Sequence, residues 1–304
     1  MSKIKAKPFL KWAGGKSQLL SRFEAYFPSE LKEGKFELYL EPFAGGGAVF
    51  FYIAQKYSLR YACLYDINKE LILTYKVIQR DLDRLIEILM EYDKKYKRLN
   101  ENDRKIFYYE VREEYNLKRH KVNYRRPSPL WVKRAGQLIF LNRTCYNGLF
   151  RVNREGEFNV PFGRYKNPKI LDDENLKRVS FLLKKADIER ADFSKVKTKV
   201  SANSFVYFDP PYKPISETAS FTSYSKYIFD DKEQIRLASL YRELDRKGAK
   251  LMLSNSDPKN EDRENDFFDK LYEGYHIYRV DARRAINSNP AKRGNIKELI
   301  ITNY

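Results

Sequence analysis

Apolar runs of strand length alternate with helical patterns along the first third of the chain. Residues 36–41 form one apolar run, which is followed by three glycines and then by a helical pattern over residues 48–57. Residues 61–65 form a second run that ends in Asp66, and apolar residues then recur at helical spacing over residues 71–89. This order of strand, glycine loop, helix, strand and acid is typical of a nucleotide-binding α/β unit.

The second half of the chain repeats the alternation of strands and helices. A helix capped by Asp230 or Asp231 is expected to end near Gly248. The strands predicted in this half are residues 204–208, 250–254, 275–280 and 298–302, the last two as an antiparallel pair. We therefore expect a doubly wound, Rossmann-like α/β domain built from residues 1–74 and 170–304. Residues 75–169 would form a mainly helical insertion.

Positive charge is concentrated in the predicted insertion. The chain carries 59 Lys and Arg against 41 Asp and Glu, a net charge of +18. Residues 94–169 alone contain 20 basic and 7 acidic residues, so +13 of this charge lies in a quarter of the chain. Residues 94–140 have helical patterns, whereas residues 143–165 alternate aromatic, apolar and basic positions around Gly148 and Gly156, which predicts a β-hairpin. A basic insertion with a hairpin suits contact with a nucleic-acid groove.

Several classes of protein are disfavoured by the composition. No apolar run is long enough to span a bilayer, and the first residues lack the apolar core of a signal peptide. Cys63 and Cys145 are the only cysteines, so we expect no disulfide framework and a reducing, cytoplasmic location. His120 and His276 are the only histidines, which makes a histidine-based triad or a zinc site hard to assemble. We therefore expect no metal.

The glycine loop supports more than one interpretation. Gly45 opens a Gly-Gly-Gly sequence, but Phe50 stands where the dinucleotide fingerprint requires a third glycine, so an NAD site is the weaker interpretation. The Gly-Lys-Ser sequence near the N-terminus is not a P-loop, because Leu10 stands at the upstream glycine position. Asp66 lies 21 residues beyond Gly45, where an acidic side chain would bind ribose hydroxyls. A simple tight turn remains the alternative.

The tetrapeptide Asp209-Pro210-Pro211-Tyr212 follows the apolar run 204–208. The two prolines lack N–H groups, so the carbonyls of Asp209 and Pro210 are free to accept hydrogen bonds from a ligand amino group. Acceptors beside an aromatic ring could hold a planar base that carries an exocyclic amine. The alternative is a strand that merely ends in a Pro-Pro turn.

With these motifs in place, the chain resembles the adenine-specific DNA methyltransferases, and it closely resembles the bacterial and phage enzymes that methylate adenine within GATC. The motifs occur in the order of that family over nearly the whole chain. They are residues 9–16, 41–47, 65–68, 141–151, 157–165, 209–212 and 221–224. The resemblance implies direct transfer of a methyl group from S-adenosylmethionine to a flipped adenine, with no covalent intermediate.

The resemblance also implies roles for single residues. The catalytic residues would be Asp209, Pro210, Pro211 and Tyr212, with Asp209 and the Pro210 carbonyl holding the amine and Tyr212 stacked on the base. The cofactor-binding residues would be Trp12, Lys16, Phe43, Gly45, Gly47, Asp66, Ile67, Asp192 and Asp209. Asp66 would bind the ribose of the cofactor, and Asp192 its adenine.

The partner implied by the resemblance is double-stranded DNA, and a restriction endonuclease for the same site could accompany the enzyme. The residues expected to contact DNA are Lys11, Tyr146, Asn147, Leu149, Arg151, Pro161 and Tyr165, with Arg151 and Lys11 reading guanines. Residues 213–229 would form a lid that orders when DNA binds. The alternatives are an RNA or protein amide methyltransferase, or a catalytically silent DNA-binding module.

Overall fold

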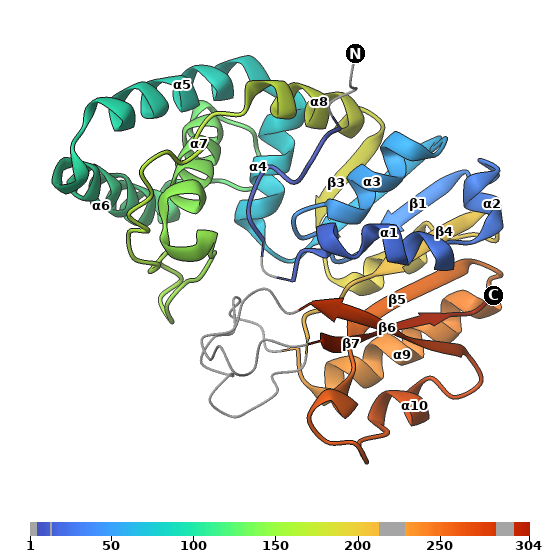
Figure 1. Ribbon diagram of the computed structural model, residues 1–304. Coiled ribbons are helices and arrows are strands. Elements are labelled where there is room, and N and C mark those ends of the chain that lie inside the picture. The colour runs from blue at the N-terminus through green and yellow to red at the C-terminus, as the bar shows by residue number, and fades with distance from the viewer. Residues whose placement is uncertain (1–4, 13, 213–228, 284–294) are drawn as a thin grey trace.

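One mixed sheet forms the centre of the molecule. The computed structural model describes residues 5–12, 14–212, 229–283 and 295–304, and the strands in these ranges follow the order β3-β2-β1-β4-β5-β7-β6 (Figure 1). Their bounds are β1 Leu38–Glu41, β2 Tyr61–Asp66, β3 Ala186–Arg190, β4 Ser204–Phe208, β5 Lys250–Ser256, β6 His276–Arg283 and β7 Asn295–Thr302. Strands β1 to β5 pair in parallel, whereas β7 is antiparallel to both of its neighbours. The predicted α/β class and the closing antiparallel pair are therefore confirmed.

Helices cover both faces of the sheet because side chains alternate along each buried strand. On β1, Tyr39 packs into one core and Leu40 into the other, and Tyr207 and Phe208 divide in the same way on β4. The first core lies under α3 (Ala48–Lys56), α4 (Lys69–Arg80) and α8 (Asp173–Leu183). The second core lies under α9 (Asp231–Arg246) and α10 (Phe267–Leu271). Two short helices precede the sheet, α1 (Leu20–Phe23) and α2 (Ser29–Lys32).

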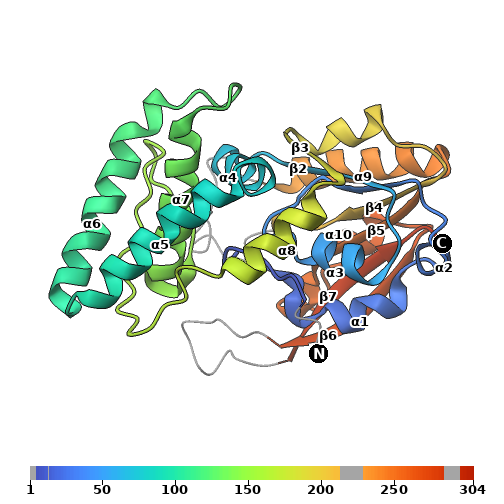
Figure 2. The same cartoon turned by 90° about the horizontal axis from the view of Figure 1, so that it is seen from above.

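Three further helices lie beside the sheet instead of on it. They are α5 (Leu82–Arg98), α6 (Glu101–Leu117) and α7 (Pro129–Thr144), and Figure 2 shows them grouped to one side of the strands. The helical pattern predicted over residues 71–89 is not one helix, because the backbone at Asp81 (φ −130°, ψ 38°) separates α4 from α5. Ile78 and Leu85, on either side of this break, are both buried. The spacing of the apolar residues therefore predicted correctly which of them are buried, but it did not reveal the break between the two helices.

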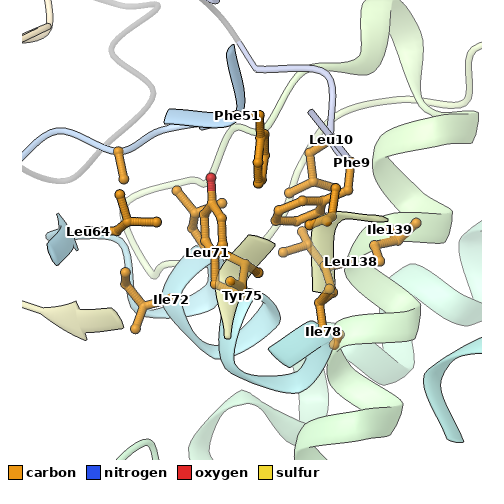
Figure 3. Packing of buried hydrophobic residues seen from close by; sticks show 14 of the residues in the cluster. Phe9, Leu10, Phe51, Leu64, Leu71, Ile72, Tyr75, Ile78, Leu138 and Ile139 are labelled. Carbon is orange, nitrogen blue, oxygen red and sulfur yellow. The ribbon is translucent and has the colours of Figure 1, made fainter. Parts of the chain in front are cut away.

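Tyr75 on α4 connects the sheet to this group of helices. Phe9 meets its ring edge-on, at 4.8 Å between centroids and 87° between planes, and Phe51 of α3 and Leu138 of α7 lie around it (Figure 3). The Tyr75 hydroxyl donates to the Gly45 carbonyl at 3.0 Å. Packing of α4 is thereby coupled to the position of the glycine loop.

The segment predicted as a hairpin pairs less regularly than expected. Its antiparallel pairing consists of two isolated bridges, Cys145 with Phe162 and Val152 with Phe158, and no named strand is formed in this described segment. The second bridge is flanked by two ladder bonds, from the Asn153 N–H to the Glu157 carbonyl at 2.9 Å and from the Asn159 N–H to the Arg151 carbonyl at 3.1 Å. The N–H and carbonyl of Phe158 face away from this ladder, and Asn116 of α6 accepts from the N–H at 2.8 Å and donates to the carbonyl at 3.1 Å. The polar groups at the outer edge of the segment are therefore satisfied by a helix.

Candidate active site

The carboxyl ends of β2, β1 and β4 meet at one edge of the sheet. Leu38 pairs with Tyr61 on one side and with Ser204 on the other, both in parallel. The chain passes from β1 to β2 in one direction and reaches β4 on the opposite side of β1. Ligands of open α/β sheets bind at such a switch point. Asp66 and Asp209, at the ends of β2 and β4, both lie at this edge.

The glycine loop is held in place by Asp66. Its carboxylate accepts from the Gly45 N–H at 3.0 Å through Oδ2 and from the Asn68 N–H at 2.8 Å through Oδ1. Burial raises the pKa of Asp66, and these backbone hydrogen bonds oppose that rise. A Cβ atom at Gly45 would lie 3.1 Å from the Trp12 ring, so a larger residue would push the ring away. Asp66 is half-buried and each of its oxygens keeps a lone pair for a ligand.

Lys16 contacts Asp209 directly. Its ammonium lies 2.6 Å from Asp209 Oδ1 and 3.1 Å from the Gly14 carbonyl, and the lysine side chain is only 3% exposed. The Ser254 hydroxyl donates to the same oxygen of Asp209 at 3.2 Å. Burial raises the pKa of Asp209, whereas the charge and hydrogen bond of Lys16 act in the opposite direction. Asp209 is thus a half-buried carboxyl group, its side chain 20% exposed, with a cation bound to it.

Tyr212 is held at its ring face and at its hydroxyl. The Lys16 ammonium lies 4.5 Å from the centroid of the Tyr212 ring. The Tyr212 hydroxyl donates to Oε2 of Glu298 on β7 at 2.5 Å. Glu298 is 5% exposed, and burial raises its pKa. The aromatic residue of the tetrapeptide therefore has a defined orientation, although it lies outside any helix or strand.

An aromatic cluster stands beside Asp192. Phe43 stacks on Phe193 at 5.4 Å and 30°, and Phe229 lies 5.6 Å from Phe43 and 5.8 Å from Phe193. Arg236 of α9 donates to both carboxylate oxygens of Asp192, at 2.8 and 2.7 Å, and covers the face of Phe193 at 3.9 Å. These bonds lower the pKa of Asp192. The cluster could receive a flat ring, with an anion fixed at its border.

The N-terminal segment joins this edge of the sheet to α7 and the following loop. Asn142 of α7 accepts from the Lys11 N–H at 2.8 Å and donates to the carbonyls of Lys11 and Gly148, at 2.9 and 2.8 Å. Trp12 stacks on Phe150 at 5.6 Å and 21°. The Lys11 ammonium lies 4.8 Å from the centre of the Tyr165 ring. Trp12, which was predicted to bind the cofactor, therefore lies close to Lys11 and Tyr165, which were predicted to contact DNA.

The remaining residues predicted to contact DNA have different environments. Tyr146 is 55% exposed and its N–H donates to the Pro161 carbonyl at 2.8 Å. Asn147 is exposed and has a left-handed backbone (φ 55°), whereas Leu149 is half-buried against the core. Arg151 is half-buried and donates through Nε to Asn159 Oδ1 at 2.8 Å. Tyr146 and Arg151 are thus accessible on the same loop.

Some predicted residues cannot be placed or lie elsewhere than expected, and some residues that contact the site were not predicted. Residues 213–228 of the predicted lid lie outside the described residues. Ile67 is exposed beside Asp66, and its carbonyl accepts from Arg190 at 3.1 Å. Lys16, which was expected on the cofactor side, contacts the tetrapeptide through Asp209. Sequence reasoning missed Ser254, Arg236 and Glu298, and no local motif distinguishes these three residues.

Comparison with known proteins defines the class. Residues 12–286 match the family model of the D12 class N6 adenine-specific DNA methyltransferases, so the chain belongs to this family and is an adenine-specific DNA methyltransferase. The resemblance inferred from the motifs is confirmed. Family membership also implies a methyl donor of the S-adenosylmethionine type and a DNA substrate. Over the described residues, no helix is long and apolar enough to cross a membrane.

Individual relatives span the whole chain. A Type II methyltransferase of Methanocaldococcus jannaschii, M.MjaIII, is 55% identical over 302 residues, which cover 99% of this chain and 100% of the relative. The Type II methyltransferase M1.LlaDCHI of Lactococcus lactis subsp. cremoris is 37% identical, covering 100% and 97%. A DNA adenine methylase of Escherichia coli K12 is 33% identical, covering 97% and 95%. The matched region thus covers at least 95% of each of these three relatives.

Proposed function

We propose that this enzyme methylates the exocyclic amino nitrogen of adenine within GATC sites of duplex DNA, on a base that is flipped out of the helix. The methyl group passes directly from S-adenosylmethionine to the amine. Family membership supports the adenine and the DNA. The GATC site rests on the resemblance of residues 141–151 and 157–165 to enzymes with that specificity.

One observation carries the chemical part of the proposal. The Lys16 ammonium is bonded to Asp209 and lies against the face of Tyr212, at 2.6 and 4.5 Å. An amine that is being methylated becomes a positively charged nitrogen with N–H donors, as this ammonium is. The same carboxylate and ring would therefore favour the charge that develops during methyl transfer, which is where a preorganised site lowers a barrier.

The residues at the carboxyl edge of the sheet fit the cofactor. Loop residues Phe43 to Gly47 would pass beside the amino-acid part of the cofactor at the N-terminus of α3, where Gly47 supplies no side-chain cap. Asp66 has lone pairs for ribose hydroxyls, and Asp192 lies beside aromatic rings that could pack against adenine. S-adenosylmethionine supplies an electrophilic methyl group on a sulfonium. Trp12, whose ring lies beside Gly45, closes the cofactor site at the glycine loop.

The tetrapeptide prepares the amine for attack. Its nitrogen lone pair is delocalised into the adenine ring, so the ground-state amine is a poor nucleophile. Asp209 and the Pro210 carbonyl accept its two hydrogens, which favours the rehybridised nitrogen and stabilises its positive charge. Tyr212 stacks on the extruded base, while Pro211 restricts the backbone between them. Lys16 leaves Asp209 when the amine enters.

Residues 75–169 act as the target-recognition insertion in this proposal. Arg151 donates to Asn159 through Nε and Nη2, and it reads a guanine through Nη1 and the second N–H of Nη2. Lys11 contacts a second guanine. Tyr146 and Leu149 fill the space that the flipped base vacates, and Asn147 holds a phosphate. Pro161 and Tyr165 shape the outer base pair. The exposure of Tyr146 and its contact with the Pro161 backbone support this arrangement.

The test is methylation of defined duplexes. Purified enzyme, S-adenosylmethionine and a duplex with a single GATC should give N6-methyladenine by mass spectrometry, whereas duplexes with one substituted base in the site should react roughly 5- to 150-fold more slowly. Asp209→Ala is the inactive control. Equal methylation of all duplexes would contradict the GATC site, and a product on cytosine or on RNA would contradict the proposed reaction. A restriction endonuclease for the same site is the proposed partner in the cell.

A further inference from the structure

Glu298 is a buried carboxylate next to the catalytic tetrapeptide. It lies on β7, opposite Ser256 of β5 and Val280 of β6, and only 5% of it is exposed. Burying a carboxylate costs free energy unless hydrogen bonds or charges compensate, so an apolar residue would be the ordinary choice between two strands. An ionisable group retained in such a place is a candidate for a functional role.

The hydrogen-bond partner of Glu298 is the aromatic residue of the site. The Tyr212 hydroxyl donates to Glu298 Oε2, and no other hydrogen bond of the Glu298 side chain is found among the described residues. Two further charges face Glu298, the Lys16 ammonium that favours its ionised form and the Asp209 carboxylate that opposes it. The carboxylate, the phenol, the ammonium and Asp209 therefore form one connected chain of contacts.

Tyr212 needs an anchor at its hydroxyl because its backbone supplies little restraint. It follows two prolines and lies outside any strand or helix, so no ladder of backbone hydrogen bonds determines its position. A bond at the hydroxyl fixes χ1 through the position of the oxygen. This oxygen lies on the axis of χ2, so the bond restrains χ2, and with it the plane of the ring, through the preference of the phenolic O–H for the ring plane. Ring orientation matters at this residue, because stacking on a base depends on the plane of the ring.

We propose that Glu298 is a positioning residue which, by accepting the hydrogen bond of the Tyr212 hydroxyl, holds the ring in the plane on which the flipped adenine stacks. This inference rests on the proposed function of Tyr212. It adds a residue from the last strand of the sheet to the support of the active site. Glu298 itself does not touch the base; it acts through the phenol.

A double-variant cycle tests the bond. Tyr212→Phe removes only the hydroxyl, and Glu298→Leu removes only its acceptor. Each should lower kcat about tenfold, while KM for DNA stays within about twofold, because the ring orientation matters at the transfer step more than for duplex affinity. The double variant should be no slower than either single variant, since both changes break one bond. Glu298→Gln keeps a carbonyl acceptor and should recover kcat to within about threefold of the original enzyme.

A structural readout separates positioning from folding. Duplexes with 2-aminopurine at the target position report the environment of the extruded base by fluorescence, and both single variants should give a less quenched signal at saturating enzyme, because stacking is looser. The matched control is Asp281→Asn, an exposed carboxylate on β6 that pairs with Lys297 at 2.6 Å. It should change neither kcat nor the fluorescence.

Several outcomes would overturn the inference. They are an unchanged kcat in Tyr212→Phe, additive losses in the double variant, or a Glu298→Gln variant as slow as Glu298→Leu. If Glu298→Leu fails to fold, Tyr212→Phe and Glu298→Gln still test the same bond. Failure of the proposed function is distinguishable, because then the unaltered enzyme would form no N6-methyladenine on the GATC duplex.

Discussion

Glu70 of α4 and Arg134 of α7 form a buried, two-point ion pair, with Nε to Oε2 at 2.7 Å and Nη2 to Oε1 at 2.8 Å. Arg134 also donates to the Tyr115 carbonyl at 2.8 Å and lies over the Tyr115 ring at 3.9 Å. The Tyr124 hydroxyl donates to Glu70. Helices α6 and α7 and the loop between them are thus joined through one ion pair to α4, the helix that supports the glycine loop.

Removing one partner of this pair should destabilise the protein. Glu70→Ala leaves a buried guanidinium without its anion, and such losses typically cost about 3–5 kcal/mol. Chemical denaturation followed by circular dichroism measures the free energy of unfolding. Lys97→Ala, which breaks the exposed pair of Lys97 with Asp93 on α5, is the control and should have a much smaller effect. Similar losses in both variants would mean that the buried pair has no special weight.

Asp209 should matter for the rate of methyl transfer more than for DNA binding. In the proposed mechanism its carboxylate stabilises charge that appears only during transfer, and loss of one preorganised group of this kind costs on the order of a hundredfold or more in rate. Asp209→Ala should therefore abolish methylation in single-turnover assays, while duplex affinity measured by fluorescence anisotropy stays within a few-fold. Near-normal turnover in this variant would refute the mechanism.

Lys16 should set the acid limb of the pH profile. Burial raises the pKa of Asp209 and Lys16 lowers it, so removing the ammonium in Lys16→Met lets that pKa rise further. The ionised fraction of Asp209 in the free enzyme then falls at a given acidic pH, and the acid limb of kcat/KM moves to higher pH. The measurement is kcat/KM for DNA against pH, with the exposed Lys35→Met as the control. A limb that stays in place, or that moves to lower pH, would argue against an ionised Asp209 in catalysis.

Loss of Asp66 should weaken cofactor binding. Asp66→Ala removes the acceptor of the Gly45 and Asn68 N–H groups, so the glycine loop loses two charge-assisted bonds together with its ribose partner. Hydrogen bonds to a charged group contribute about 1.5–3 kcal/mol, which corresponds to roughly 10- to 150-fold in affinity. Calorimetric titration with S-adenosylhomocysteine measures the change. Asp187→Ala, a partly exposed residue of the neighbouring strand β3 paired with Lys199, should bind normally. Equal affinities would move the ribose site elsewhere.

Substitutions of Arg151 and Lys121 should distinguish a residue that reads a base from one that contacts the DNA backbone. Arg151→Ala should lose about 1–3 kcal/mol of discrimination at one guanine and allow methylation of near-cognate duplexes. Lys121→Ala, an exposed change in the preceding basic stretch, should instead weaken binding to all duplexes alike and reduce the salt slope by about one unit. Methylation rates on a panel of singly substituted sites decide between them. Uniform weakening by Arg151→Ala would identify it as a phosphate contact.

The sequence was most informative where chemistry is local. The strand that ends at Asp66, the strand before Asp209 and the cap at Asp230 follow from neighbouring residues, and the structure contains each of them. Gly45 was recognised as a loop residue because the helix and strand around it have clear patterns. Such signals need only a few consecutive residues.

The sequence was least informative where partners are distant. Glu298 reaches Tyr212 across 86 positions and Lys16 reaches Asp209 across 193, and no spacing rule connects such pairs. The outer edge of the predicted hairpin is bonded by Asn116, on a helix 42 positions away, which accepts from the backbone N–H of Phe158. Periodicity predicts which side of an element is buried, but it does not predict which other segment covers it.

Gln79, near the end of α4, donates to the carbonyls of Leu183 and Ala186 at 2.7 and 2.9 Å. The chain therefore leaves the sheet layer and returns to it at two points that are bonded to each other, although about a hundred residues separate them. The residues between α4 and α8 contribute no strand to the sheet, so their number can change while every strand pairing stays the same. A graft at this junction would have to keep Arg134 for Glu70 and Asn142 for Lys11, because these contacts fasten the inserted helices to the parts of the chain that form the site.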